Sequence, residues 1–117
     1  MTLESGDQIF FETGTDRMTL WLLSKANLER RELADVVVLD GADVARFIDA
    51  LWGVQYAVVV EKDRPDTSWL KVEASGATSR ARLTGDGNEV VLTVPERSML
   101  MEAVKSRAWK LFQREAL

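Results

Sequence analysis

The stretch that decides the fold is Val36-Val37-Val38-Leu39-Asp40, an apolar run that ends on a typical helix-start residue. A second stretch, Val90-Val91-Leu92-Thr93-Val94, has the same form and also leads into a helical pattern. Runs of β-branched residues favour strands, and self-similarity along a chain indicates a repeated unit. We therefore expect one strand-and-helix unit to occur twice, approximately over residues 7–53 and 54–115, within a single domain of residues 1–117.

The residues around these two runs predict further strands, because aromatic or alternating apolar segments are bounded by Gly, Pro and Asp. The expected strands cover residues 7–12, 17–23 and 32–39 in the first unit, and 55–62, 68–75, 79–84 and 90–94 in the second. Asp86-Gly87 predicts a type I′ hairpin turn, which needs positive φ at both central residues. That turn pairs Leu83 with Val90. Because a positive φ is costly for residues other than glycine, we expect Gly87→Val to lower the melting temperature.

Two helices are expected after the apolar runs. Asp40 and Asp43 form an acidic helix start, and Gly53 is a suitable residue to end that helix. Thr93 and Glu96 form a capping box for a second helix that runs to about residue 114. The order βββα-ββββα predicts an α+β fold with a curved, mostly antiparallel sheet of about seven strands that carries two helices.

The composition excludes many enzyme mechanisms. The 117 residues include no cysteine and no histidine, which removes thiol nucleophiles, thiolate metal sites and the usual proton carrier near neutral pH. The apolar runs are much shorter than the ~20 residues that cross a bilayer, and the first residues are acidic, unlike a leader sequence. We therefore expect a non-enzymatic cytoplasmic protein with no cofactor, no metal and no membrane contact.

Two patterns resemble known site motifs and are interpreted as structural. Ser68 and Lys71 match a serine-x-x-lysine motif, but their odd spacing in a strand puts them on opposite faces. A group of carboxylates could suggest a Mg²⁺ or Ca²⁺ site, but it lacks the ligand spacing and the glycine of a calcium loop. These carboxylates are Asp35, Asp40, Asp43 and Asp49.

Apolar residues on both faces of the first strands predict a partner. Trp21 and Leu23 alternate with other leucines, and Phe11 follows another phenylalanine. Strands that are apolar on both faces need cover on both, whereas two helices can cover one face of such a sheet. Either the sheet closes on itself or another chain supplies the second layer. We favour a homo-oligomer or a dedicated protein partner, with Phe11, Trp21 and Leu23 as the candidate interface.

The outward face of the second unit is a different candidate. Side-chain alternation puts Trp69 and Lys71 on one face with Arg80 and Arg82 of the next strand. An aromatic ring among bases suits single-stranded nucleic acid, where stacking contributes ~1–3 kcal/mol per base. The net charge of −4 opposes this interpretation, as does Glu73, which must lie opposite one of the two arginines. Nucleic-acid binding is therefore the second choice.

The doubled strand-and-helix plan resembles, in architecture only, the whirly and PC4-type group of proteins. The curved sheets of that group oligomerise, and several members bind single-stranded nucleic acid. The resemblance rests on the order of the elements, and a fold does not fix a function. We therefore expect a binding or regulatory protein that acts through protein–protein contacts.

Overall fold

The structure is a computed structural model that describes residues 1–53, 56–62, 64–76 and 79–116, with side chains up to residue 108. In chain order the elements are β1 (Gln8–Thr13), β2 (Met18–Leu23), α1 (Lys25–Glu29), β3 (Asp35–Leu39), α2 (Gly41–Trp52), β4 (Ala57–Val60), β5 (Leu70–Ala74), β6 (Ala81–Thr84), β7 (Glu89–Leu92) and α3 (Val94–Ala116). This order confirms the α+β class. Gln55, which was expected to begin a strand, lies outside the described residues.

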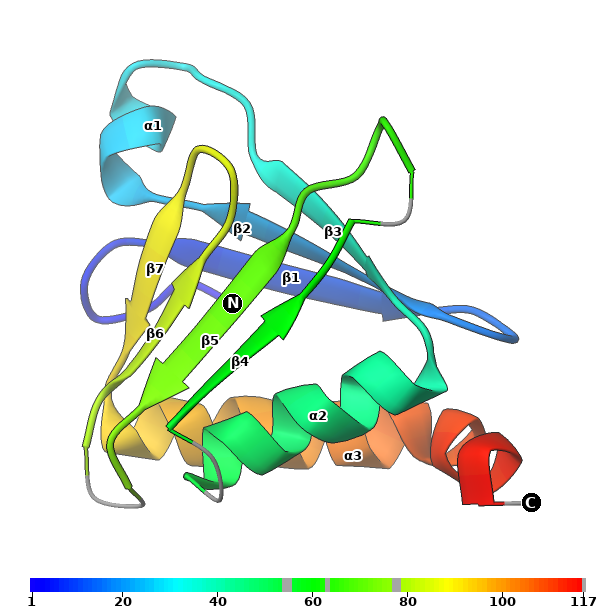
Figure 1. The fold of residues 1–117 in the computed structure, drawn as a ribbon. Coiled ribbons are helices and arrows are strands. Elements are labelled where there is room, and N and C mark those ends of the chain that lie inside the picture. The colour runs from blue at the N-terminus through cyan, green and yellow to red at the C-terminus, as the bar shows by residue number, and fades with distance from the viewer. Residues whose placement is uncertain (54–55, 63, 77–78, 117) are drawn as a thin grey trace.

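The strands form two antiparallel sheets and not the single curved sheet that we expected. Sheet A has the order β1-β2-β3, and sheet B has the order β4-β5-β6-β7. Figure 1 shows the two sheets crossing each other, with sheet B in front of sheet A. At one corner the N–H of Ser68, shortly before β5, donates to the carbonyl of Val36 on β3 at 2.6 Å. Because α2 separates β3 from β4 in the chain, no hairpin brings the two sheets into one ladder.

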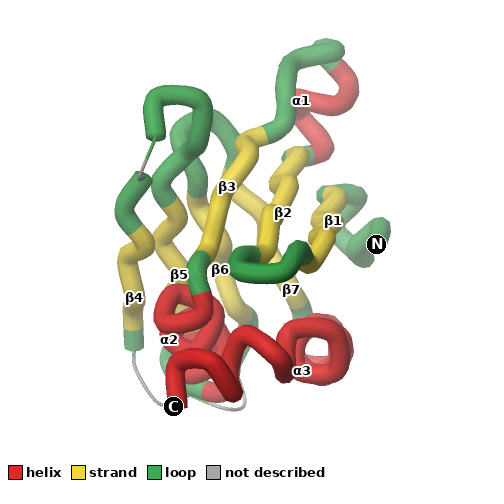
Figure 2. The backbone as a smooth tube through the Cα atoms, turned by 90° about the vertical axis from the view of Figure 1, so that its right-hand side faces the viewer, coloured by secondary structure: helices red, strands yellow, loops and turns green. Residues whose placement is uncertain are grey.

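The hydrophobic core lies between the inner faces of both sheets and the two long helices. It joins residues of every layer, including Leu20 of sheet A, Leu83 of sheet B, Phe47 of α2 and Val104 of α3. Figure 2 shows α2 and α3 at one end of the sheets and α1 at the other. Helix α2 packs mainly on α3, β5 and β4. The helix of the first unit therefore covers strands of the second.

Polar side chains close the seams between the sheets. The carboxylate of Asp7, which is buried, accepts hydrogen bonds from the N–H of Lys25 at 2.8 Å and from the N–H of Val91 at 3.2 Å. Val91 lies on β7, the edge strand of sheet B, so its outward N–H is satisfied by a side chain. At the opposite edge, Arg46 of α2 donates to the carbonyl of Val59 on β4 at 3.0 Å.

The register of the β6–β7 hairpin is the predicted one. Leu83 lies opposite Val90, and Ala81 lies opposite Leu92. All four side chains are buried. The alternation of apolar and polar residues was therefore enough to align these two strands.

The predicted type I′ turn at the tip of this hairpin is wrong. Neither Asp86 nor Gly87 has a positive φ. The N–H of Gly87 donates to the carboxylate of Asp35 at 2.9 Å, and its carbonyl accepts from the side chain of Asn27 at 2.7 Å. These bonds hold the loop against sheet A and α1, and the N–H of Gly85 still donates to the carbonyl of Asn88 at 2.8 Å across the tip. Gly87→Val therefore has no cost that arises from a positive φ.

The caps of the first long helix confirm its predicted bounds. The carboxylate of Asp40 accepts from the N–H of Asp43 at 2.7 Å, and Asp43 accepts from the N–H of Asp40 at 3.4 Å. Burial raises the pKa of Asp43 above its ordinary value. Gly53 ends the helix with a φ of 79°, a left-handed conformation that favours glycine.

The capping box of α3 also forms as predicted. The carboxylate of Glu96 accepts from the N–H of Thr93 at 2.9 Å and from the N–H of Glu4 at 2.8 Å. Partial burial would raise the pKa of Glu96, but these backbone donors outweigh it and hold the pKa below its ordinary value. Glu96 therefore both begins the helix and fixes the N-terminal segment to it.

Candidate binding surfaces

The outer face of sheet A carries a row of apolar side chains. Phe10, Trp21 and Val36 lie opposite one another on β1, β2 and β3, and Leu23 lies on the same face opposite Gln8. Trp21, Leu23 and Val36 are half-buried, whereas Phe10 is 48% exposed. No described element covers the Phe10 end of this row. The structure thus brings Trp21 and Leu23 together on one accessible face.

Phe11, the third residue of the predicted interface, lies on the other face of the sheet. It is opposite Leu20, whose neighbour on β3 is Val37, and both of these are fully buried. The guanidinium of Arg107 on α3 lies over the Phe11 ring, 5.2 Å from its centroid. Because successive residues of a strand point to opposite faces, Phe10 takes the place that the prediction gave to Phe11.

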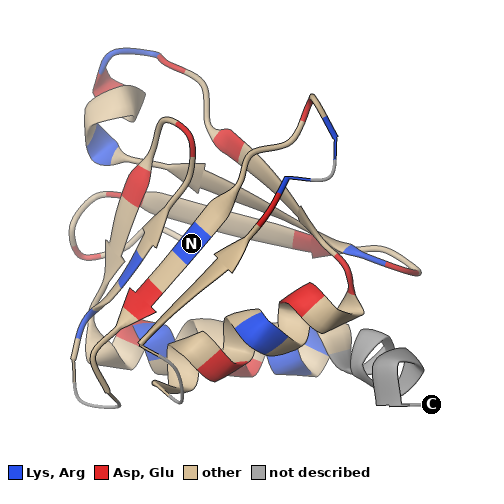
Figure 3. Cartoon of the chain, viewed as in Figure 1, with Lys and Arg blue, Asp and Glu red and all other residues tan. Residues whose placement is uncertain are grey.

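The predicted nucleic-acid face of sheet B is largely neutralised by ion pairs. The ammonium group of Lys71 lies 3.5 Å from the carboxylate of Glu73, and the guanidinium of Arg82 lies 3.2 Å from that of Glu89. Glu73 lies opposite Arg82 in the register, as one of the two expected pairings. Figure 3 shows acidic and basic positions interspersed over this sheet. Lys71 and Arg82, the two basic residues of the candidate site that lie on strands, therefore each have an acidic neighbour.

Trp69 and Arg80 lie far apart on this face. Ala74 of β5 is opposite Ala81 of β6, so Arg80 is level with Ser75, six residues along β5 from Trp69. At ~3.3 Å per residue, the two positions are separated by roughly 20 Å along the strands. The four predicted residues do not form a single stacking site.

Tyr56 is an aromatic residue that the sequence did not assign to this surface. It is 67% exposed and lines a shallow hollow of about 230 Å³ with Arg80, Arg82 and Glu73. The strand that follows Tyr56 had no predicted register, so nothing in the sequence placed its ring beside the two arginines. The aromatic and basic groups of sheet B meet here and not at Trp69.

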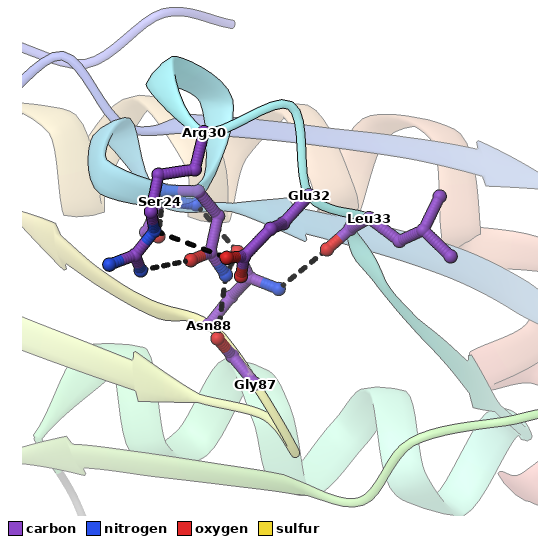
Figure 4. A network of polar contacts seen from close by, with 7 residues as sticks. Ser24, Arg30, Glu32, Leu33, Gly87 and Asn88 are labelled. Atoms are coloured by element: carbon purple, nitrogen blue, oxygen red, sulfur yellow. Dashed lines mark hydrogen bonds and ion pairs between the residues drawn. The ribbon is translucent and has the colours of Figure 1, made fainter.

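A buried polar network links α1, β3 and the β6–β7 loop (Figure 4). The side chain of Asn88 donates to Asp35 at 3.0 Å and to the carbonyl of Leu33 at 3.2 Å, and its oxygen accepts from the N–H of Ser24 and from Asn27, both at 2.9 Å. Among the described residues, no buried side-chain N or O atom lacks a hydrogen-bond partner. We therefore interpret the network as structural.

The serine-x-x-lysine pattern has a structural explanation as well. The hydroxyl of Ser68 is buried and donates to the carboxylate of Asp35 at 2.9 Å. Lys71 makes its ion pair with Glu73 on the opposite, outward face of β5. The two side chains of the pattern therefore do not meet, as the strand parity predicted.

Arg97 is a buried charge that the sequence reasoning missed. It is 3% exposed, and its guanidinium donates to the carbonyls of Leu51 at 3.1 Å, Gly76 at 2.8 Å and Ser79. Burial lowers the pKa of Arg97. No described carboxylate forms an ion pair with it, and the C-terminal end of α2 supplies the favourable dipole. Arg97 ties α2, α3 and the β5–β6 connection together.

The acidic residues considered as a cation site occupy separate places. Asp35 lies in the buried network, Asp40 and Asp43 cap α2, and Asp49 is exposed. Within the described ranges, no three acidic side chains are grouped so that they could hold a metal ion. In the same ranges, no helix combines the length and the apolar character needed to span a membrane.

Comparison of the chain with protein-family models, with curated proteins and with solved structures gave no match. The resemblance to the whirly and PC4-type group therefore remains an expectation from the order of the elements.

Proposed function

We propose that this chain is a non-enzymatic binding or regulatory protein that acts through protein–protein contacts and self-associates through the outer face of sheet A. The observation that supports this is the row formed by Phe10, Trp21 and Val36, whose exposed end is a phenylalanine ring. Contiguous apolar side chains on an accessible sheet face are typical of interaction sites.

Two copies can bury this row by stacking their A sheets face to face. Stacked sheets lie ~10 Å apart, and a two-fold axis would make the same residues meet on both sides. Three strands of this length cover about 14 by 20 Å, or roughly 300 Å², whereas a stable interface buries ~800 Å² per partner. We therefore expect weak association that depends on concentration.

Trp21→Glu should keep the chain monomeric at concentrations where the wild type associates. The substitution puts two carboxylates face to face across the proposed interface and adds a charge to its centre. Sedimentation velocity from about 10 to about 500 μM spans the affinity range that a small interface predicts. The wild-type average mass should rise over this range, while circular dichroism should show that the variant is folded.

The matched control is Val59→Glu, which adds the same charge at an exposed apolar position of sheet B. It should leave association unchanged. A wild-type chain that stays monomeric throughout would overturn self-association, and equal disruption by Val59→Glu would show that the contact does not involve sheet A.

Single-stranded nucleic acid is the second candidate, supported by the hollow that Tyr56 shares with Arg80 and Arg82. We expect weak or absent binding, because the few basic side chains can contact few phosphates. The number of phosphates contacted also sets how steeply the affinity falls as the salt concentration rises. Fluorescence anisotropy of a labelled oligothymidine at low salt tests this in the wild type, in Tyr56→Ala and in a Trp69→Ala, Arg80→Ala double variant. Submicromolar affinity at physiological salt, lost in a variant, would favour nucleic acid over the protein partner.

A further inference from the structure

A groove of about 260 Å³ lies between β1 and α3. Leu100, Ala103 and Arg107 line one side, and their spacing puts them on one face of α3. Ile9 and Phe11 of β1 line the other. Ala103 is the smallest of these side chains, and a larger residue there would fill the space. Met1 and Phe10 complete the lining, so the groove is mainly apolar, with the guanidinium of Arg107 and the N-terminal ammonium group of Met1 beside it.

The rim of this groove is an open strand edge. Ile9 exchanges two backbone hydrogen bonds with Met1, at 3.0 and 2.9 Å, so the first residues of the chain already add a short strand there. Alternate residues of a strand present their N–H and C=O groups to the same edge, so those of Phe11 and Thr13 also point away from β2. Among the described residues, neither has a backbone partner on that edge.

Arg107 gives the groove a charge preference. Its exposed guanidinium lies over the ring of Phe11, and none of the ion pairs between described residues includes it. A guanidinium held over an aromatic face keeps its outer N–H groups available for a carboxylate. An occupant with an acidic group at this end would complement it.

We propose that the groove between β1 and α3 binds an extended peptide of another protein as an additional strand of sheet A. The backbone of the peptide pairs with Phe11 and Thr13, an apolar side chain enters the space above Ala103, and a carboxylate pairs with Arg107. Strand addition of this kind takes its affinity from main-chain bonds and its specificity from pockets for alternate side chains. The site uses the edge of sheet A, whereas the proposed self-association uses its outer face, and Phe10 borders both.

Selection from a random dodecapeptide display library on the wild-type chain tests this proposal. Enriched peptides should combine alternating apolar residues with an acidic residue. Synthetic copies should bind at least about tenfold more weakly to Ala103→Phe, which fills the groove, and to Arg107→Glu, which reverses its charge. Lys105→Glu is the matched control, because Lys105 lies over Trp52, 4.7 Å from the ring centroid and away from the groove. Its affinity should equal that of the wild type.

Hydrogen exchange of the wild-type chain, saturated with an enriched peptide, gives a second readout that needs no substitution. The amides of Phe11 and Thr13 should become protected when an enriched peptide is bound. Failure to enrich any peptide, equal affinity for Arg107→Glu and the wild type, or unchanged exchange at these two amides would each overturn the proposal. The last two measurements decide the matter if Ala103→Phe does not fold.

Discussion

Arg97→Met should lower the free energy of unfolding by about 3 kcal/mol or more, because it removes a buried guanidinium that donates to three backbone carbonyls. These are the carbonyls of Leu51, Gly76 and Ser79, of which Gly76 has a second donor in the hydroxyl of Ser79 at 3.1 Å. Methionine keeps an unbranched apolar stem that ends near the position of Nε, so the loss combines the missing hydrogen bonds with the space left by the rest of the guanidinium. Urea denaturation followed by tryptophan fluorescence measures the change.

Two further variants distinguish the loss of these buried hydrogen bonds from the general effect of removing an arginine. Arg82→Met removes an exposed guanidinium that pairs with Glu89, and we expect a change within about 0.5 kcal/mol. Arg97→Lys keeps the charge but has a single ammonium group, which cannot reproduce the planar set of donors, so its stability should lie between those of Arg97→Met and the wild type. An Arg97→Met chain as stable as the wild type would contradict the role assigned to this residue.

Gly85→Ala should destabilise the chain by about 2 kcal/mol, since overpacking at a rigid site costs ~1–3 kcal/mol. A Cβ at this position would lie 2.7 Å from a carboxylate oxygen of Asp35 and 3.0 Å from its Cβ. Asp35 cannot move away easily, because Ser68, Gly87 and Asn88 all donate to it. Thermal unfolding followed by circular dichroism measures the loss.

Gly87→Ala is the control for this substitution, two residues along the same loop. A Cβ at Gly87 would meet no atom within 4 Å, and the backbone there has no positive φ. We expect a change within about 0.5 kcal/mol. If Gly87→Ala were the more damaging of the two, the loop would have the tight-turn conformation that the sequence suggested.

Local patterns predicted the elements well, because they depend on neighbours in the chain. The alternation of Leu83 and Val90 with polar residues aligned β6 with β7, and the residues around Asp40 and Gly53 set the ends of α2. The choice between Phe10 and Phe11 needed the register of the first hairpin, which the turn residues alone did not specify. One step of register exchanges the two faces of a strand.

The sequence positions of two charged residues indicate that their side chains are buried. Asp35 is in phase with Val37 and Leu39 on the inner face of β3, and Arg97 is in helical phase with Val104. A charged residue at an apolar position predicts a buried polar contact. Its partners could not be predicted, because they are backbone groups of segments distant in the sequence, such as Leu51 for Arg97. The division of the strands into two sheets depends on the same distant contacts.

The hydrogen bond from the N–H of Val91 on β7 to the carboxylate of Asp7 also limits how copies of this chain can polymerise. A fibre that grows by adding strand to strand needs two open edges on each subunit, one to join the preceding copy and one to receive the next. In sheet B the outward N–H of Val91 is occupied by Asp7, so an incoming strand would have to displace a buried side chain. At the other edge, the carbonyl of Val59 on β4 already accepts from Arg46, so an incoming strand would meet a side-chain hydrogen bond at each edge of sheet B.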